Sequence, residues 1–287
     1  GAKLISVDPR FTRTSAKADI YAPIRSGTDI AFIGGMIKYV LDEMEQHPEN
    51  YNMLYVREYT NAAFLIDPDF KGPADLDGLF SGYDPAKRAY DKSTWRYQLD
   101  ENGIPKKDKT LKDPHCVFQL LKKHFARYDP DTVCSITGTP KDTYLEICRT
   151  FAATGKPGKA GTIMYAMGTT QHTNGTQMIR SYAILQLLLG NIGVSGGGIN
   201  ALRGESNVQG STDHCLLAHI LPGYLKQPIN KDQTLEQHLN RVLAGLQNND
   251  PKSANWWQNY PKYMVSLLKA WYGSAATPDN EFGYQYL

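Results

Sequence analysis

A short apolar strand, a polar turn and an amphipathic helix follow one another near the start of this chain, and the same order recurs later. The first copy has apolar runs at residues 4–7 and 20–24, then the turn RSGTD, in which Thr28 or Asp29 is a natural N-cap. The helix that follows has its apolar residues on one stripe: Ile30, Ile33, Ile37, Val40, Leu41 and Met44. This repeated order predicts an α/β fold.

The second copy has a strand at residues 162–166, a polar loop at 168–175 and a buried helix at 177–189, which stops at Gly190. In a doubly wound fold, a ligand is held at a strand–loop–helix unit of this kind. Further helices are expected at 117–128 and at 235–246. Another is expected between them, with Thr139 as N-cap, Pro140 at the first helical position and Gly155 as the stop.

Residues 1–204 are therefore expected to form a doubly wound, Rossmann-like domain, and residues 205–287 to begin a second α/β domain. The first domain contains a polar segment, 67–114, which is a surface insertion or a partner-facing loop. Within it, the sequence TWRYQLDENG predicts a small hairpin with a turn at Asn102 and Gly103. The residues expected on one face of that hairpin are Trp95, Tyr97 and Leu99.

Composition excludes several classes of function. The formal net charge of +2 is too small to indicate binding to nucleic acid or to an anionic membrane surface. The longest apolar run, 182–194, contains Gln186 and Asn191 and indicates a buried helix rather than a membrane span. No cysteine has zinc or iron–sulfur spacing, and four ordinary buried thiols are expected: Cys116, Cys134, Cys148 and Cys215. The ends of the sequence, GAKLISVD and NEFGYQYL, lead us to expect a piece of a longer polypeptide.

Several residues have the chemistry of anion or nucleotide binding. Asp8 follows the first strand, where an acidic residue can bond ribose hydroxyls, and Arg10 adds donors for phosphate or a purine. The glycine-rich stretch GGGINALRGESNVQG surrounds Arg203, whose guanidinium suits a carboxylate or a phosphate. Taken singly, Asp8 could form a turn, Arg203 a salt bridge and His172 a loop hydrogen bond. The absence of GxGxxG and GxxxxGK[ST] argues against dinucleotide dehydrogenases and P-loop enzymes.

Taken together, the motifs resemble those of the formate dehydrogenases, within the molybdopterin oxidoreductases of the dimethyl-sulfoxide-reductase family. The stretches that carry the resemblance are SVDPRFTRTSAKAD, APIRSGTDIAF, YAMGTTQHTNG, QLLLGNIGVSGGGINALRGESNVQG and PGY. The insertion DGLFSGYD with AYDKSTWRYQLDENG resembles the large periplasmic, membrane-associated type. The chain is thus expected to be an internal fragment of a multidomain molybdopterin oxidoreductase.

The resemblance implies oxidation of formate to carbon dioxide at a molybdenum or tungsten held by two molybdopterin guanine dinucleotides. It also implies a four-iron, four-sulfur cluster in an N-terminal part upstream, with electrons passing to an iron–sulfur subunit and to a membrane cytochrome subunit. The metal ligand, its following histidine and the cluster cysteines would lie upstream, so the fragment alone should be inactive. The implied location is the periplasm.

The resemblance also assigns roles to residues. The guanosine end of one cofactor would be lined by Asp8, Arg10, Gly27 and Asp29. The pterin or its phosphates would be approached by Met167, Gly168, Gln171 and His172, and the cofactor also by Gly204, Glu205 and Asn207. Arg203 would hold formate, and no metal ligand is expected in this chain. The alternatives are a nitrate or polysulfide reductase of the same family, or a non-catalytic α/β nucleotide-binding module.

Overall fold

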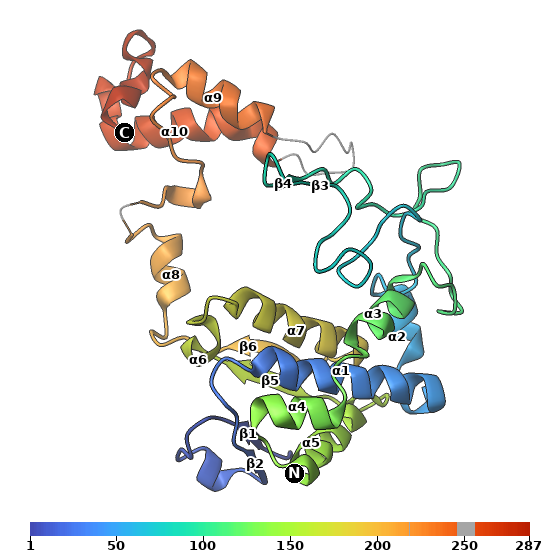
Figure 1. Ribbon diagram of the computed structural model, residues 1–287. Helices are drawn as coiled ribbons and strands as arrows, with labels where there is room; N and C mark the ends of the chain where they lie inside the picture. The colour runs from blue at the N-terminus through green and yellow to red at the C-terminus, as the bar shows by residue number, and fades with distance from the viewer. Residues whose placement is uncertain (218, 246–255) are drawn as a thin grey trace. The chain divides into compact units, whose positions relative to one another are not determined.

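The computed structural model describes residues 1–217, 219–245 and 256–287, and it divides into two compact units, Gly1–Leu202 and Arg203–Leu287 (Figure 1). Each unit has an apolar core of its own. The first unit combines helices with parallel strand pairs, which confirms the expected mixture of helix and sheet. The cofactor-binding role expected of each unit stays a prediction.

Two short strands near the N-terminus, β1 (Ile5–Val7) and β2 (Ile20–Ala22), pair in parallel. The chain then enters α1 (Asp29–Gln46), which buries most of its predicted stripe. Thr28 is the N-cap of α1 by position, but its hydroxyl donates to the carbonyl of Arg25 at 2.7 Å and accepts no bond from the helix. α1 is central to the first unit because four other helices pack on it.

Those four helices surround α1, as Figure 1 shows most clearly for α7 and α4. They are α3 (Val117–Phe125), α4 (Pro130–Thr137), α5 (Lys141–Ala152) and α7 (Gly175–Leu188). Pro140, not Thr139, is the N-cap of α5, because the Thr139 hydroxyl donates to the carbonyl of Pro23 at 2.7 Å. Gly155 ends the short 3-10 turn after α5.

The second strand pair, β5 (Thr162–Tyr165) and β6 (Gly198–Ala201), is also parallel, and α6 (Met167–Thr170) and α7 connect its strands. The glycine-rich sequence had not indicated β6. Among the described residues, the two parallel pairs remain separate two-stranded sheets, whereas the doubly wound expectation was one sheet. Each of these strands is only three or four residues long.

The short helix α2 (Met53–Glu58) comes before the polar segment 67–114. Within that segment, β3 (Tyr83–Asp84) and β4 (Ala89–Tyr90) form an antiparallel hairpin that the sequence had not predicted. The turn expected at Asn102 and Gly103 is present, and Leu99 pairs with Pro105 across it. The expected common face is not formed, because Trp95 packs on Phe80 and Tyr90 while Tyr97 packs on Phe64.

The second unit forms only helices over residues 203–217, 219–245 and 256–287, so the sheet expected of a second α/β domain is not among them. Its α-helices are α8 (Val208–Asp213), α9 (Leu235–Ala244) and α10 (Tyr260–Tyr272). The helix expected at 235–246 ends at Ala244, and residue 246 itself lies outside the described part of the chain.

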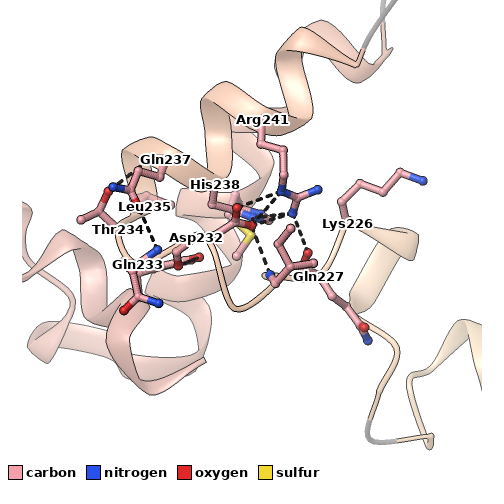
Figure 2. Close-up of polar contacts among 12 residues, drawn as sticks. Lys226, Gln227, Asp232, Gln233, Thr234, Leu235, Gln237, His238 and Arg241 are labelled. Atoms are coloured by element: carbon pink, nitrogen blue, oxygen red, sulfur yellow. Dashed lines mark hydrogen bonds and ion pairs between the residues drawn. The ribbon is translucent and has the colours of Figure 1, made fainter.

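A buried polar cluster holds the second unit together (Figure 2). The Asp232 carboxylate accepts hydrogen bonds from Arg241, the shortest 2.6 Å, and contacts Nδ1 of His238 at 2.9 Å. The other ring nitrogen of His238 lies 2.7 Å from the hydroxyl of Tyr260, which donates to the carbonyl of Lys226. Because each of these buried groups has a protein partner, the cluster is structural and offers no open site.

Within the described residues, no helix combines the length and the apolar character that a membrane crossing requires.

Candidate functional site

The carboxyl ends of β1 and β2 lie at one edge of their sheet, and Asp8 is at this edge. Its backbone nitrogen donates to the carbonyl of Ala22 at 3.2 Å, and its carbonyl accepts a bond from the Tyr21 hydroxyl at 3.0 Å. Its Oδ1 accepts a hydrogen bond from the backbone nitrogen of Arg10 at 2.7 Å. Asp8 therefore does form the turn that its sequence allowed, while its second oxygen and the exposed Arg10 side chain remain available to a ligand.

The turn before α1 leaves β2 at the same edge. Gly27 has φ +83°, a conformation that side chains disfavour. A Cβ atom at Gly27 would lie 3.8 Å from Cδ2 of His172. Apart from the chain neighbours of Gly27, no other described residue would come within 4 Å of it. The turn before α1 and the loop before α7 therefore lie side by side, although they are far apart in sequence.

The loop after β5 differs from its prediction, because the expected polar loop at 168–175 begins with the helical turn α6. Met167, Gly168 and Gln171 are exposed, and Nε2 of Gln171 lies 3.6 Å from the Met167 sulfur. His172 is half-buried, with its Nδ1 3.4 Å from the carbonyl of Thr169. Of the four residues expected to contact the cofactor here, three are thus exposed and His172 is partly covered.

Tyr182 and Thr169 are functional candidates that the sequence did not single out. Both are buried, and the Tyr182 hydroxyl lies 3.2 Å from Oγ1 of Thr169. Burial raises the pKa of Tyr182 to about 12, and the Asp29 carboxylate at the start of α1 contributes to this rise. Helical periodicity indicates that Tyr182 is buried, but it carries no information on the partner of the hydroxyl.

The predicted residues around Arg203 begin the second unit. Arg203, Gly204, Glu205 and Asn207 are all exposed, and no side chain of the described residues is paired with the Arg203 guanidinium. Asn207 stands at the N-cap of α8, and a Cβ atom at Gly210 would lie 2.3 Å from its Oδ1, so the Asn207 side chain occupies the space beside Gly210. The salt bridge that would have explained Arg203 structurally is not formed among these residues.

Over the described residues, no cluster of three or more histidine, cysteine, aspartate or glutamate side chains is placed to hold a metal ion. All four cysteines are free. Cys116 and Cys148 are buried as expected, but Cys134 and Cys215 are only half-buried, because α4 and the segment after α8 leave them near the surface. Burial raises the pKa of Cys148 to about 12, so this thiol stays protonated at neutral pH.

Comparison with known proteins identifies relatives for the whole chain. The molybdopterin oxidoreductase family profile matches residues 1–266. The chain is 53% identical over 289 residues to formate dehydrogenase 2 subunit alpha (cytochrome c-553) of Nitratidesulfovibrio vulgaris. It is 55% identical over 287 residues to formate dehydrogenase subunit alpha of Megalodesulfovibrio gigas. In both cases all of this chain is covered, but it spans only 27% of the relative's length.

A solved structure, acetylene hydratase from Pelobacter acetylenicus, aligns with a TM-score of 0.43 at 23% identity. The alignment covers 68% of this chain and 18% of that one, a likeness too low to bear on function.

Proposed function

The chain belongs to the molybdopterin oxidoreductase family, and from that premise we propose that it is part of the catalytic subunit of a formate dehydrogenase. The observation that carries the proposal is the identity of 53–55% over the whole chain to two proteins named as formate dehydrogenase alpha subunits. The reaction is oxidation of formate to carbon dioxide. The fragment supplies substrate- and cofactor-binding residues, and the rest of the subunit supplies the metal ligand.

The residues at the edge of the first unit fit a pterin dinucleotide. The Gly27 turn is open, and the N-terminus of the 18-residue helix α1 favours negative charge such as a phosphate. The free oxygen of Asp8 suits a ribose hydroxyl. The guanosine end would be held by Asp8, Arg10, Gly27 and Asp29, and the pterin or its phosphates would be approached by Met167, Gly168, Gln171 and His172. Cofactor-binding residues are also proposed in the second unit: Gly204, Glu205 and Asn207. When bound, this cofactor supplies the metal centre that accepts two electrons.

Arg203 is proposed to hold the formate carboxylate. Its guanidinium can bond both oxygens at once and stays charged at every working pH. It therefore orients the substrate and does not carry a proton. Glu205, two residues further, would repel formate, so its carboxylate is assigned to a pterin nitrogen or to a basic neighbour.

The finer features of the enzyme are part of the same proposal. They are two molybdopterin guanine dinucleotides on molybdenum or tungsten, and a four-iron, four-sulfur cluster upstream of this fragment. Electrons would pass to an iron–sulfur subunit and on to a membrane cytochrome subunit, and the enzyme would lie in the periplasm. Nucleic acid is not a proposed partner.

The test is anaerobic purification of the full-length protein, followed by formate-dependent reduction of an artificial electron acceptor. Formate oxidation by a preparation that contains molybdopterin is the expected result. Reduction of nitrate or polysulfide without formate oxidation would assign the protein to a sister enzyme. A protein that binds guanine nucleotide but contains neither molybdopterin nor metal would be a non-catalytic module.

A further inference from the structure

Tyr182 occupies an unusual position among the buried tyrosines of the first unit, because its hydroxyl contacts a segment with a proposed ligand role. It lies on α7 and is 7% exposed, and its ring centroid lies 5.9 Å from that of Tyr165, the last residue of β5, with the ring planes tilted by 55°. Its hydroxyl lies 3.2 Å from Oγ1 of Thr169 in α6. The tyrosine therefore joins α7 to the loop that precedes it.

The helix that carries Tyr182, α7, also packs on α1. Burial raises the pKa of Tyr182, and the Asp29 carboxylate adds to this rise. Asp29 is the first residue of α1 and follows the Gly27 turn, which lies beside His172. Two segments with proposed cofactor contacts, the turn before α1 and the loop 167–172, thus lie side by side, and the Tyr182 hydroxyl contacts the second of them at Thr169.

We propose that Tyr182 is a positioning residue, which holds the 167–172 loop in place beside the turn before α1 through its contact with Thr169. The inference rests on the proposed function in one respect, since it takes this edge to face the molybdopterin cofactor. Tyr182 itself is buried and does not contact the ligand. It acts by keeping the exposed Met167, Gly168 and Gln171 in one arrangement, so that the cofactor does not have to order the loop as it binds.

A purely structural role is the competing explanation, and Tyr144 provides the matched control. Tyr144 is also buried in the first unit, and its hydroxyl donates to the carbonyl of Phe32 in α1 at 2.8 Å. It lies on α5 and has no contact with the 167–172 loop among its described partners. Tyr144→Phe therefore removes a buried tyrosine hydroxyl without disturbing the loop.

The experiment uses the full-length protein as wild type, Tyr182→Phe, Thr169→Val, the double variant and Tyr144→Phe. The first readout is the rate at which molybdopterin is lost, measured from the fluorescence of its oxidised derivative. The second is hydrogen exchange of the amides of residues 167–172. We expect cofactor loss about three- to tenfold faster, and faster loop exchange, in both single variants. The double variant should match the singles, because both remove the same contact.

Tyr144→Phe should leave both readouts at the wild-type level even if it lowers the melting temperature. Wild-type behaviour of Tyr182→Phe, an equal effect of Tyr144→Phe, or additive effects in the double variant would overturn the proposal. Failure of the proposed function looks different. A wild-type protein that holds molybdopterin without oxidising formate refutes that function, yet the comparison of variants still stands. If the wild type holds no molybdopterin, loop exchange alone decides on Tyr182.

Discussion

The side-chain nitrogen of Asn191 donates a hydrogen bond to the side-chain oxygen of Gln186 at 2.8 Å, and neither residue is exposed to solvent. The Gln186 nitrogen in turn donates to the carbonyls of Gly161 and Gly198 at 2.9 and 2.6 Å. Oδ1 of Asn191 accepts a bond from the backbone nitrogen of Gly161 at 3.1 Å. These two amides therefore fasten the amino ends of β5 and β6, a role that a purely apolar helix could not fill.

The first prediction concerns this pair. Asn191→Ala should destabilise the β5–β6 region, because Gln186 loses a buried partner and Gly161 and Thr154 lose partly buried ones. Each buried group left unsatisfied costs roughly 1–3 kcal/mol. Hydrogen exchange of the β5 and β6 amides in the full-length protein measures the effect. Asn102→Ala, at an exposed residue, is the control. Equal exchange rates in the two variants would show that Asn191 does not fasten β5 and β6.

The sequence predicted the elements whose signals are local. Apolar spacing and capping residues located β1, β2, α1, β5 and α7 to within about two residues of their observed ends. It missed β6 because Gly198–Ala201 has little strand propensity of its own. That strand depends on pairing with β5 and on the Gln186 amide, and these contacts come from distant parts of the chain.

In the candidate site, too, local signals could be predicted from the sequence and contacts between distant parts of the chain could not. The residue types and their places after strands identified Asp8 and the 167–172 loop, because chain order alone places both at carboxyl ends of strands. The proximity of Gly27 to His172 depends on how α1 and α7 pack, so the sequence could not show it. The partner of the Tyr182 hydroxyl was hidden for the same reason.

The second prediction concerns acid sensitivity of the second unit. Hydrogen bonds from Arg241, and next from His238, hold the pKa of the Asp232 carboxyl well below its usual range. A carboxyl whose pKa is lowered by folding stabilises the folded state above the unfolded-state pKa of about 3.9 and loses that contribution as the pH falls further. Proteolytic resistance of the region around α9 and α10 should therefore decline below about pH 4.

Asp232→Asn should remove most of this acid dependence and lower resistance already at pH 7, since the amide cannot accept the same set of charge-assisted bonds. The exposed Glu236→Gln on the same unit is the matched control and should behave as wild type. An unchanged pH profile in Asp232→Asn would show that another group governs the acid response.

The third prediction separates two roles of Asp8. Asp8→Ala removes both the bond to the Arg10 backbone and the free oxygen proposed to bind ribose. A hydrogen bond to a charged group contributes about 1.5–3 kcal/mol, so cofactor release should be about ten- to a hundredfold faster. Asp8→Asn keeps an acceptor for Arg10 and should lose only part of that affinity. Molybdopterin content and melting temperature of the full-length variants should be measured together.

If cofactor content follows the melting temperature in both variants, Asp8 only forms a turn. Loss of cofactor at an unchanged melting temperature supports the ribose contact.

The last prediction concerns Arg203, an exposed guanidinium without a side-chain partner among the described residues of its unit. If it holds formate by two charge-assisted bonds of about 1.5–3 kcal/mol each, Arg203→Ala should lower kcat/KM for formate on the order of a hundredfold or more. Arg203→Lys should recover only part of this loss, because lysine has no planar fork with which to bond both oxygens.

Steady-state kinetics of the complete enzyme must be paired with metal and molybdopterin content in the same preparations. The control is Arg127→Ala, since Arg127 is an exposed arginine whose Nε donates to the carbonyl of His124 at 3.0 Å and for which no ligand contact is proposed. Near wild-type efficiency of both Arg203 variants at full metal content would refute the formate anchor. Activity that falls only in proportion to the metal lost would instead place Arg203 among the residues that hold the cofactor, because each remaining loaded enzyme would then turn over normally.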